Sequence, residues 1–137
     1  IKSLEQFKDP YDSFYKDIVH EIKESQFGKI KKKFNSHFGY VNLFPFLFGL
    51  IEQDSESFKA VMTLMTHEKG LWSRFGIRSL AQFDQYFLKG DQYWTEPVWL
   101  NINYLILKAI VRYYPGAKGS AEFYKTLRAN LMQTVTF

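Results

Sequence analysis

The spacing of apolar residues along the chain predicts helices over most of its length. In the first, Asp12 or Ser13 caps an apolar stripe of Phe14, Ile18 and Ile22, which follow the i, i+4 repeat of an amphipathic helix. The side chains expected to face water are those of Lys16, Asp17, Glu21 and Lys23.

Two more helices are expected in the middle of the chain. From Tyr40 to Gln53 apolar residues occur on every side, as in a helix that is buried all round, and Pro45 fits its first turn. Ser55 or Ser57 then begins a helix that Gly70 terminates. The apolar residues of this third helix are Phe58, Val61, Met62 and Met65.

The last third of the chain predicts two further helices. One runs from Pro97 to Tyr114, where Pro115 and Gly116 break it. The other is capped by Ser120. The stripe of this last helix consists of Phe123, Leu127 and Leu131. Because no stretch shows the sustained alternation of a strand, we expect an all-α fold.

The segment from Glu68 to Glu96 interrupts the helical pattern and is rich in aromatic residues. Such rings anchor a loop, because each can bury roughly 150–250 Å². Arg74 and Arg78 lie among them. The rings are those of Trp72, Phe75, Phe83, Tyr86, Phe87, Tyr93 and Trp94. Aromatic faces pack on the C–H faces of sugars while arginine and amide groups bond hydroxyls, so this composition suits a carbohydrate site, with packing in a core as the alternative.

Composition and charge narrow the possible classes of function. The 137 residues make one domain or part of one, and 46% hydrophobic residues exclude a disordered chain. The absence of cysteine excludes a disulfide scaffold. The net charge of +4 is spread out except at Lys29, Lys31, Lys32 and Lys33, where a solvated hinge between helices is expected. A surface for phosphates or an anionic membrane is the alternative, although no nucleic-acid-binding motif supports it.

The common catalytic constellations are missing from the sequence. His20, His37 and His67 lack metal-ligand spacing and are expected at the surface or at helix caps, and there is no G-x-S-x-G elbow or glycine-rich phosphate loop. The carboxylates of the aromatic segment, which could form an acid–base pair, are Asp84, Asp91 and Glu96.

Four strings of residues resemble segments of glycoside hydrolase family 63. Residues 39–47 (GYVNLFPFL) are similar to its GYVSLFPFL segment, and residues 71–80 (LWSRFGIRSL) to LWSPFGLRSL. Residues 93–105 contain YW and PVWLNINYL, similar to YWRGPVWLNVNYL, and residues 127–130 are LRAN, as in the helix that follows. The strings keep the order of the family across residues 39–130.

The resemblance implies a fold and an activity. It implies that residues 1–137 are a single partial domain, one part of an (α/α)6 toroid. The implied reaction is hydrolysis, with inversion and without a cofactor, of the terminal α-1,2-linked glucose of the glucosylated high-mannose precursor of N-glycans. It also implies a location in the endoplasmic reticulum lumen, with a membrane anchor outside this chain.

The catalytic carboxylates of the family fall in segments that this chain lacks. The resemblance places the acid in an Asp-Asp-Tyr-Pro-Arg-like segment upstream and the base in a Trp-Glu-Gln-Tyr-like segment downstream, and neither occurs in residues 1–137. We therefore expect no catalytic residue in this chain, and no glucosidase activity from the chain alone. One departure falls inside a motif, because Thr95-Glu96 replaces Arg-Gly.

Five residues are the candidates for substrate binding. Trp94 and Trp99 belong to a matching string and are expected to line the pocket, with Arg78 orienting a hydroxyl or a carboxylate. Asn101 and Asn103 serve either the pocket or backbone groups. We expect Arg78, Trp94 and Trp99 on one concave face. The side chains expected to pack rather than to touch a sugar are Tyr40, Phe44 and Phe46.

Two other classes of function remain open at this point. One is a carbohydrate-binding or helical interaction module without catalysis, and the other is a basic module that binds polyanions through Lys29–Lys33. The expected partners are a glucosylated glycan and the remainder of the polypeptide. Because the segments from Tyr40 to Gln53 and from Pro97 to Tyr114 are apolar nearly all round, we expect the isolated chain to self-associate.

Overall fold

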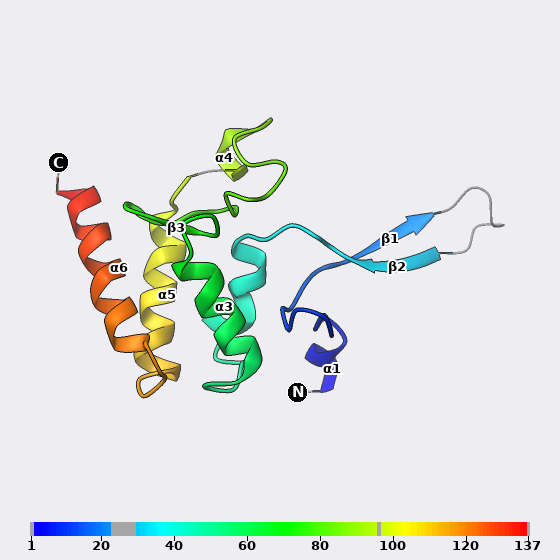
Figure 1. Ribbon diagram of the computed structural model, residues 1–137, viewed down its shortest axis with the longest axis horizontal. Coiled ribbons are helices and arrows are strands. Elements are labelled where there is room, and N and C mark those ends of the chain that lie inside the picture. Colours follow the sequence, from blue (N-terminus) through cyan, green and yellow to red (C-terminus); the bar gives the residue numbers. More distant parts are fainter. Residues whose placement is uncertain (1, 23–29, 96, 137) are drawn as a thin grey trace.

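The computed structural model describes residues 2–22, 30–95 and 97–136 and shows a helical body from which a β-hairpin projects (Figure 1). The helices are α1 (Lys2–Glu5), the 3-10 helix η2 (Tyr40–Leu43), α2 (Phe44–Leu47), α3 (Glu56–Thr66), α4 (Gln92–Thr95), α5 (Leu100–Tyr113) and α6 (Ser120–Val135). The strands are β1 (Ile18–Ile22), β2 (Ile30–Phe34), β3 (Trp72–Ser73) and β4 (Gly76–Ile77). The fold is therefore rich in helix but not all-α, because two small antiparallel sheets occur.

The first predicted helix is wrong, since Ile18 and Ile22 of its apolar stripe lie in a strand of a hairpin. Strand β1 pairs with β2, with Ile18 opposite Phe34 and Ile22 opposite Ile30. Positions 14, 18 and 22 differ by even numbers, so they share one face of a strand as well as one face of a helix. The β-branched isoleucines favour the strand.

The charged residues of this region also lie elsewhere than expected. Lys16 is buried, and its Nζ lies 2.8 Å from Asp9 Oδ2 and also bonds Asp12. Lys31, Lys32 and Lys33 lie in strand β2 rather than in a hinge between helices, and Lys32 and Lys33 are exposed. Lys23 and Lys29 lie outside the described residues.

The segment from Tyr40 to Gln53 does not form one long helix. It consists of η2 and α2, with Pro45 in the first turn of α2 as predicted. The chain then reverses at Gly49, which has φ 68°. The Leu50 N–H donates to the Pro45 carbonyl at 2.8 Å, and the Gly49 N–H donates to the Phe46 carbonyl at 3.1 Å. These two bonds and the left-handed glycine form a Schellman motif, which ends the helix.

The three longer helices are confirmed, with shifted ends. Helix α3 begins after Ser55, whose Oγ accepts a hydrogen bond from the Phe58 N–H, and it ends at Thr66 rather than at Gly70. Helix α5 begins at Leu100, because residues 97–99 are extended.

Helix α6 begins at Ser120, but the predicted cap is wrong. Gly119, with φ 80°, is the N-cap residue, and Ser120 Oγ is buried without a hydrogen-bond partner within the described residues. The expected stripe of α6 is buried.

Aromatic stacking ties the short α2 to α3 and to the end of α5. The rings of Phe46 and Tyr114 stack with centroids 4.6 Å apart, and Phe58 lies 5.1 Å from Tyr114. The Tyr114 hydroxyl donates to the Phe46 carbonyl at 3.2 Å. The core continues through the buried residues Leu43, Val61, Met65, Leu71, Ile77, Ile106 and Leu127.

One stripe of α5 stays uncovered. Leu100, Tyr104 and Val111 are exposed and recur at helical spacing along this helix. Self-association of the isolated chain stays a prediction, and this stripe is the surface that would carry it.

Buried phenols make the fold sensitive to alkali. Burial raises the pKa of Tyr15, Tyr40 and Tyr114 to about 12 from 10.0. Between pH 10 and pH 12 the folded chain keeps protons that the unfolded chain releases, so the free energy of unfolding falls as the pH rises through this range. We expect the helical circular dichroism signal to collapse within it, together with a late phenolate absorbance at 295 nm.

Two variants check the cause of this alkaline transition. Tyr114→Phe removes one buried phenol and flattens the dependence of stability on pH, although it also removes a hydrogen bond. Tyr11→Phe is the control, because Tyr11 is 96% exposed. A helical signal that persists unchanged to pH 12 would contradict the assignment.

Candidate carbohydrate-binding pocket

A junction between segments beside the candidate pocket is built around a buried amide. Asn103 is fully buried on α5, and its Oδ1 accepts a hydrogen bond from the Ile77 N–H at 2.7 Å. Its Nδ2 donates to the carbonyls of Ile77 at 2.9 Å and Trp99 at 3.0 Å. One side chain thus bonds both backbone groups of Ile77 and the carbonyl of Trp99, the last residue before α5.

A tyrosine hydroxyl completes this junction. Tyr40 donates its hydroxyl proton to the Ile77 carbonyl at 2.6 Å and accepts from the Trp99 N–H at 3.0 Å. Burial raises the pKa of Tyr40 to about 12, although the N–H donors of Trp99 and Asn103 act in the opposite direction. The phenol therefore stays protonated at neutral pH and remains the donor that the Ile77 carbonyl needs.

Backbone contacts bring the same segments together. The Tyr40 N–H donates to the Ser79 carbonyl, and the Ser79 N–H donates to the Pro97 carbonyl, both at 3.1 Å. A Cβ on Gly39 would lie 2.4 Å from the Ser79 carbonyl oxygen, so only glycine allows this approach. The three segments that meet here are 39–42, 77–80 and 97–103.

Three aromatic rings cluster beside this junction. Trp94 on α4 and Trp99 have ring centroids 4.8 Å apart, and Tyr93 lies 5.0 Å from Trp99 and 5.2 Å from Trp94. Trp94 is 59% exposed and Trp99 is half-buried, so their rings offer uncovered surface. The Ser79 hydroxyl donates to the Trp94 carbonyl at 3.1 Å and anchors α4 to the body.

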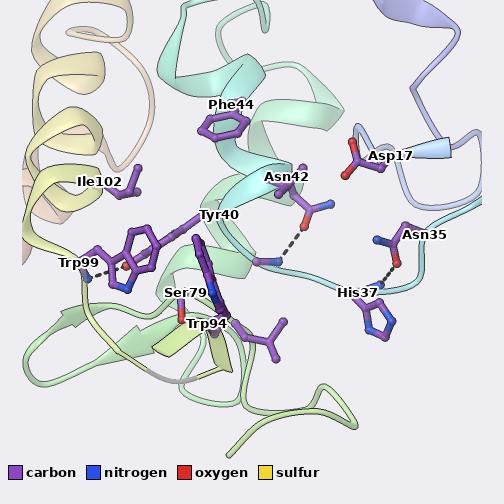
Figure 2. Close-up of a pocket in the computed structure, with 13 residues that line it drawn as sticks. Asp17, Asn35, His37, Tyr40, Asn42, Phe44, Ser79, Trp94, Trp99 and Ile102 are labelled. Carbon is purple, nitrogen blue, oxygen red and sulfur yellow. Dashed lines mark hydrogen bonds between the residues drawn. The ribbon is translucent and has the colours of Figure 1, made fainter. Parts of the chain in front are cut away.

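These rings form one side of a pocket of about 270 Å³ (Figure 2). Tyr40, Trp94 and Trp99 gather at one end of it, whereas Asp17 and Asn35 lie at the other. The remaining lining residues are His37, Gly39, Val41, Asn42, Phe44, Ser79, Leu80 and Ile102. An aromatic wall with an amide and a carboxylate opposite is the chemistry of a site for a neutral, hydroxyl-rich ligand.

The structure separates the five predicted site residues. It brings Trp94 and Trp99 together, but Arg78 lines a neighbouring hollow with Pro97 and Val98, so the expected single concave face does not form. Backbone pairing explains the separation, because Arg78 bridges to Val98 in an extended segment and successive side chains there point to opposite sides. The Arg78 guanidinium donates to the Glu68 carbonyl at 3.0 Å.

The two asparagines differ in role. Asn103 satisfies backbone groups, which is the second of its two predicted roles, and it has no exposed surface for a sugar. Asn101 is exposed, and its Oδ1 accepts from the Ile102 N–H at the start of α5. Ile102, which lies between the two asparagines in the sequence, lines the pocket.

Of the carboxylates in the aromatic segment, Asp84 and Asp91 are described, and neither lines the pocket. Asp84 is paired with His37, whose Nδ1 lies 3.0 Å from Asp84 Oδ2. Asp91 accepts from the Tyr93 N–H at the start of α4. Glu96 lies outside the described residues. Among the described residues no cluster of three histidine, aspartate or glutamate side chains is placed to hold a metal ion.

Sequence reasoning missed the polar end of the pocket. Asp17 was assigned to a solvated helix face, and Asn35 and His37 lie outside the strings that resemble the family. Tyr40 and Phe44 were expected only to pack, yet both line the pocket. No motif in the sequence marks these residues as lining a pocket. Asp17 and Asn35 reach it through the hairpin, which was not predicted.

Comparison with known proteins assigns the family. Residues 4–137 match the Glycosyl hydrolase family 63 C-terminal domain. The chain belongs to this family. The resemblance inferred from residues 39–130 is thus confirmed, and the match extends nearly to the start of the chain.

Named relatives agree with this assignment. The chain is 39% identical over 104 residues to the probable mannosyl-oligosaccharide glucosidase of Schizosaccharomyces pombe, covering 72% of this chain and 13% of that protein. It is 33% identical over 132 residues to the mannosyl-oligosaccharide glucosidase of Saccharomyces cerevisiae, covering 90% and 15%. An enzyme of the same name from Arabidopsis thaliana is 33% identical over 127 residues, covering 86% and 15%. The chain therefore spans between 13% and 15% of the length of these relatives.

None of the helices in residues 2–22, 30–95 and 97–136 has the length and apolar character that a membrane span requires.

The Asn103 junction predicts a large effect of one substitution. Asn103→Leu leaves the Ile77 N–H without its partner in a buried place, which costs about 1–3 kcal/mol. The Ile77 carbonyl also loses one of its two donors and keeps only the Tyr40 hydroxyl. We expect the free energy of unfolding to fall by about 2–5 kcal/mol, measured by urea denaturation followed through the helical signal.

Asn101→Leu is the matched control on the same helix. Asn101 is exposed, so its loss should change the free energy of unfolding by less than about 1 kcal/mol. Equal effects of the two substitutions would show that the junction does not carry the stability assigned to it.

Proposed function

We propose that this chain forms one wall of the sugar-binding pocket of a glycoside hydrolase that removes the terminal α-1,2-linked glucose from the glucosylated precursor of N-glycans, with inversion. The observation that carries the proposal is the cluster of Tyr93, Trp94 and Trp99, whose two indoles line one end of a pocket. The relatives named as mannosyl-oligosaccharide glucosidases supply the substrate class.

The catalytic carboxylates belong to other segments in this proposal. Inversion needs a carboxylic acid and a carboxylate roughly 6.5–9.5 Å apart, with a water between the base and the sugar. Asp84 and Asp91 are engaged with His37 and with the start of α4, which supports assigning the acid and the base outside this chain. The chain then supplies binding and orientation, and it needs no cofactor.

The chain is one part of an (α/α)6 toroid in this proposal. The exposed stripe of Leu100, Tyr104 and Val111 on α5 supports this. In a complete toroid neighbouring helices would cover such a stripe, so its exposure here fits a chain that is one part of the toroid. The glucosidase works in the endoplasmic reticulum lumen, where its glycan substrate is processed. The remainder of the polypeptide is accordingly the partner of this stripe.

The aromatic wall gives the first test. Trp99→Ala removes an indole on which a pyranose can stack, and Trp94→Ala removes its neighbour. We expect each substitution to weaken binding of glucose about tenfold, which corresponds to about 1.4 kcal/mol. Calorimetric or NMR titration of the protein expressed from its full reading frame measures this.

Trp99→Phe is the control for this test, because it keeps an aromatic face at the same position. It should retain most of the affinity that Trp99→Ala loses. Unchanged glucose binding by both alanine variants would remove the aromatic wall from the site.

The absence of the two carboxylate segments gives a second test. The purified 137-residue chain should release no glucose from an α-1,2-linked oligosaccharide, because positioned acid and base groups typically contribute 10²–10⁴-fold each. Glucose release is followed over hours against a blank without protein. Release that scales with the amount of chain would return Asp84 and Asp91 to consideration as catalytic groups.

A further inference from the structure

The end of the pocket opposite the indoles is built from the base of the β-hairpin. The Asn35 N–H donates to the Asp17 carbonyl at 2.8 Å, which continues the ladder beyond the Ile18–Phe34 pair. Asp17 and Asn35 are therefore cross-strand neighbours, and the Cβ atoms of such neighbours lie roughly 4.5–5.5 Å apart. Figure 2 shows both of them across the pocket from Trp99.

The polar groups of this pair have hydrogen-bonding capacity left over. Within residues 2–22, 30–95 and 97–136, the Asp17 carboxylate and the Asn35 amide nitrogen take part in no side-chain hydrogen bond or ion pair. Asn35 Oδ1 accepts from the His37 N–H at 3.1 Å, which fixes the amide with its oxygen toward the backbone and leaves its nitrogen as the available donor. Asp84 differs from Asp17, because its carboxylate is already paired with the His37 ring.

An acceptor and a donor side by side match a pair of sugar hydroxyls. The carboxylate accepts only, and the amide nitrogen donates only, whereas each hydroxyl of a pyranose both donates and accepts. Two neighbouring hydroxyls can therefore bond Asp17 with a proton and Asn35 with a lone pair. Hydrogen bonds to a charged group are stronger than those between neutral groups.

The two ends of the pocket come from different parts of the chain. Trp94, Trp99 and Tyr40 belong to the strings that resemble the family, whereas Asp17 and Asn35 precede residue 39, where those strings begin. The aromatic end offers flat apolar surface to any pyranose. The polar end offers directed bonds, which distinguish one arrangement of hydroxyls from another.

We propose that Asp17 and Asn35 form a second sugar subsite, which binds the hydroxyls of the unit that follows the sugar stacked on the indoles. The inference rests on the proposed function of the pocket and names which part of the oligosaccharide each end holds. Asp17 and Asn35 are specificity residues in this assignment and take no part in bond cleavage. A single glucose is held by the aromatic end, and a disaccharide reaches both ends.

The test compares two ligands on the protein expressed from its full reading frame. The ligands are glucose and the sulfur-linked analogue of an α-1,2-linked glucose disaccharide, which resists hydrolysis. Asp17→Asn and Asn35→Ala should each weaken binding of the disaccharide analogue about tenfold while glucose binding changes less than about twofold. Retained glucose binding also shows that the pocket is still folded in each variant, and Asn35→Ser repeats the test with a smaller polar side chain.

Matched controls come from exposed positions away from the pocket. Glu52→Gln repeats the loss of a surface carboxylate, and Gln133→Ala repeats the loss of a surface amide. Both should bind the two ligands as the unchanged protein does. A similar loss of disaccharide binding in Glu52→Gln would mean that net charge is responsible, and a similar loss in Gln133→Ala would mean that losing any surface amide has this effect. Either result overturns the proposal.

The outcomes separate this inference from the proposed function. If Trp99→Ala weakens both ligands while Asp17→Asn and Asn35→Ala bind the disaccharide analogue normally, the pocket binds sugar but the second subsite is wrong. If the unchanged protein binds neither ligand, the proposed function of the pocket fails and the subsite fails with it. Loss of disaccharide binding alone in the Asp17 and Asn35 variants supports both.

Discussion

A buried primary amide joins three segments that are far apart in the sequence. Asn103 presents an acceptor to the Ile77 N–H and donors to the Ile77 and Trp99 carbonyls, so it replaces a strand that would otherwise pair with this residue. Tyr40 adds its hydroxyl to the same carbonyl. A buried amide of this kind is expensive to leave unpaired, and each partner is therefore held close to one position.

The space around this junction is as restricted as its hydrogen bonds. Gly76 has φ 138°, and a Cβ there would lie 2.9 Å from Asn103 Oδ1 and 2.8 Å from the Val98 side chain. A larger residue would push the β3–β4 hairpin away from α5 and break the bond to Ile77. The junction thus depends on a glycine in the hairpin as much as on the asparagine in the helix.

The pocket inherits its shape from the same constraint. Trp99 is the residue before α5, and its backbone is fixed at the N–H by Tyr40 and at the carbonyl by Asn103. Its ring therefore projects at a fixed place, where Trp94 and Tyr93 meet it. A rigid platform loses little conformational freedom when a ligand binds, which suits a weakly bonding apolar sugar face.

The family, the three longer helices and the two indoles of the pocket could be predicted from the order of residues. Those results depend on residues that are close together in the chain. Periodicity over a dozen residues predicts α3, α5 and α6, and each string that matches the family is a run of consecutive residues. Local order missed the stop at Gly49, since the apolar run around this glycine reads as one helix until the reversal is known.

Which face a residue occupies depends on contacts between segments and could not be predicted locally. Residues 14, 18 and 22 fit one face of a helix or of a strand, and only the pairing of β1 with β2 selects the strand. Arg78 and Ser79 are neighbours in a family string, yet alternation along an extended segment sends them to different hollows. Asp17 reaches the pocket through a cross-strand partner that is 18 positions away, and spacing along a chain carries no information about a contact that two strands make by pairing.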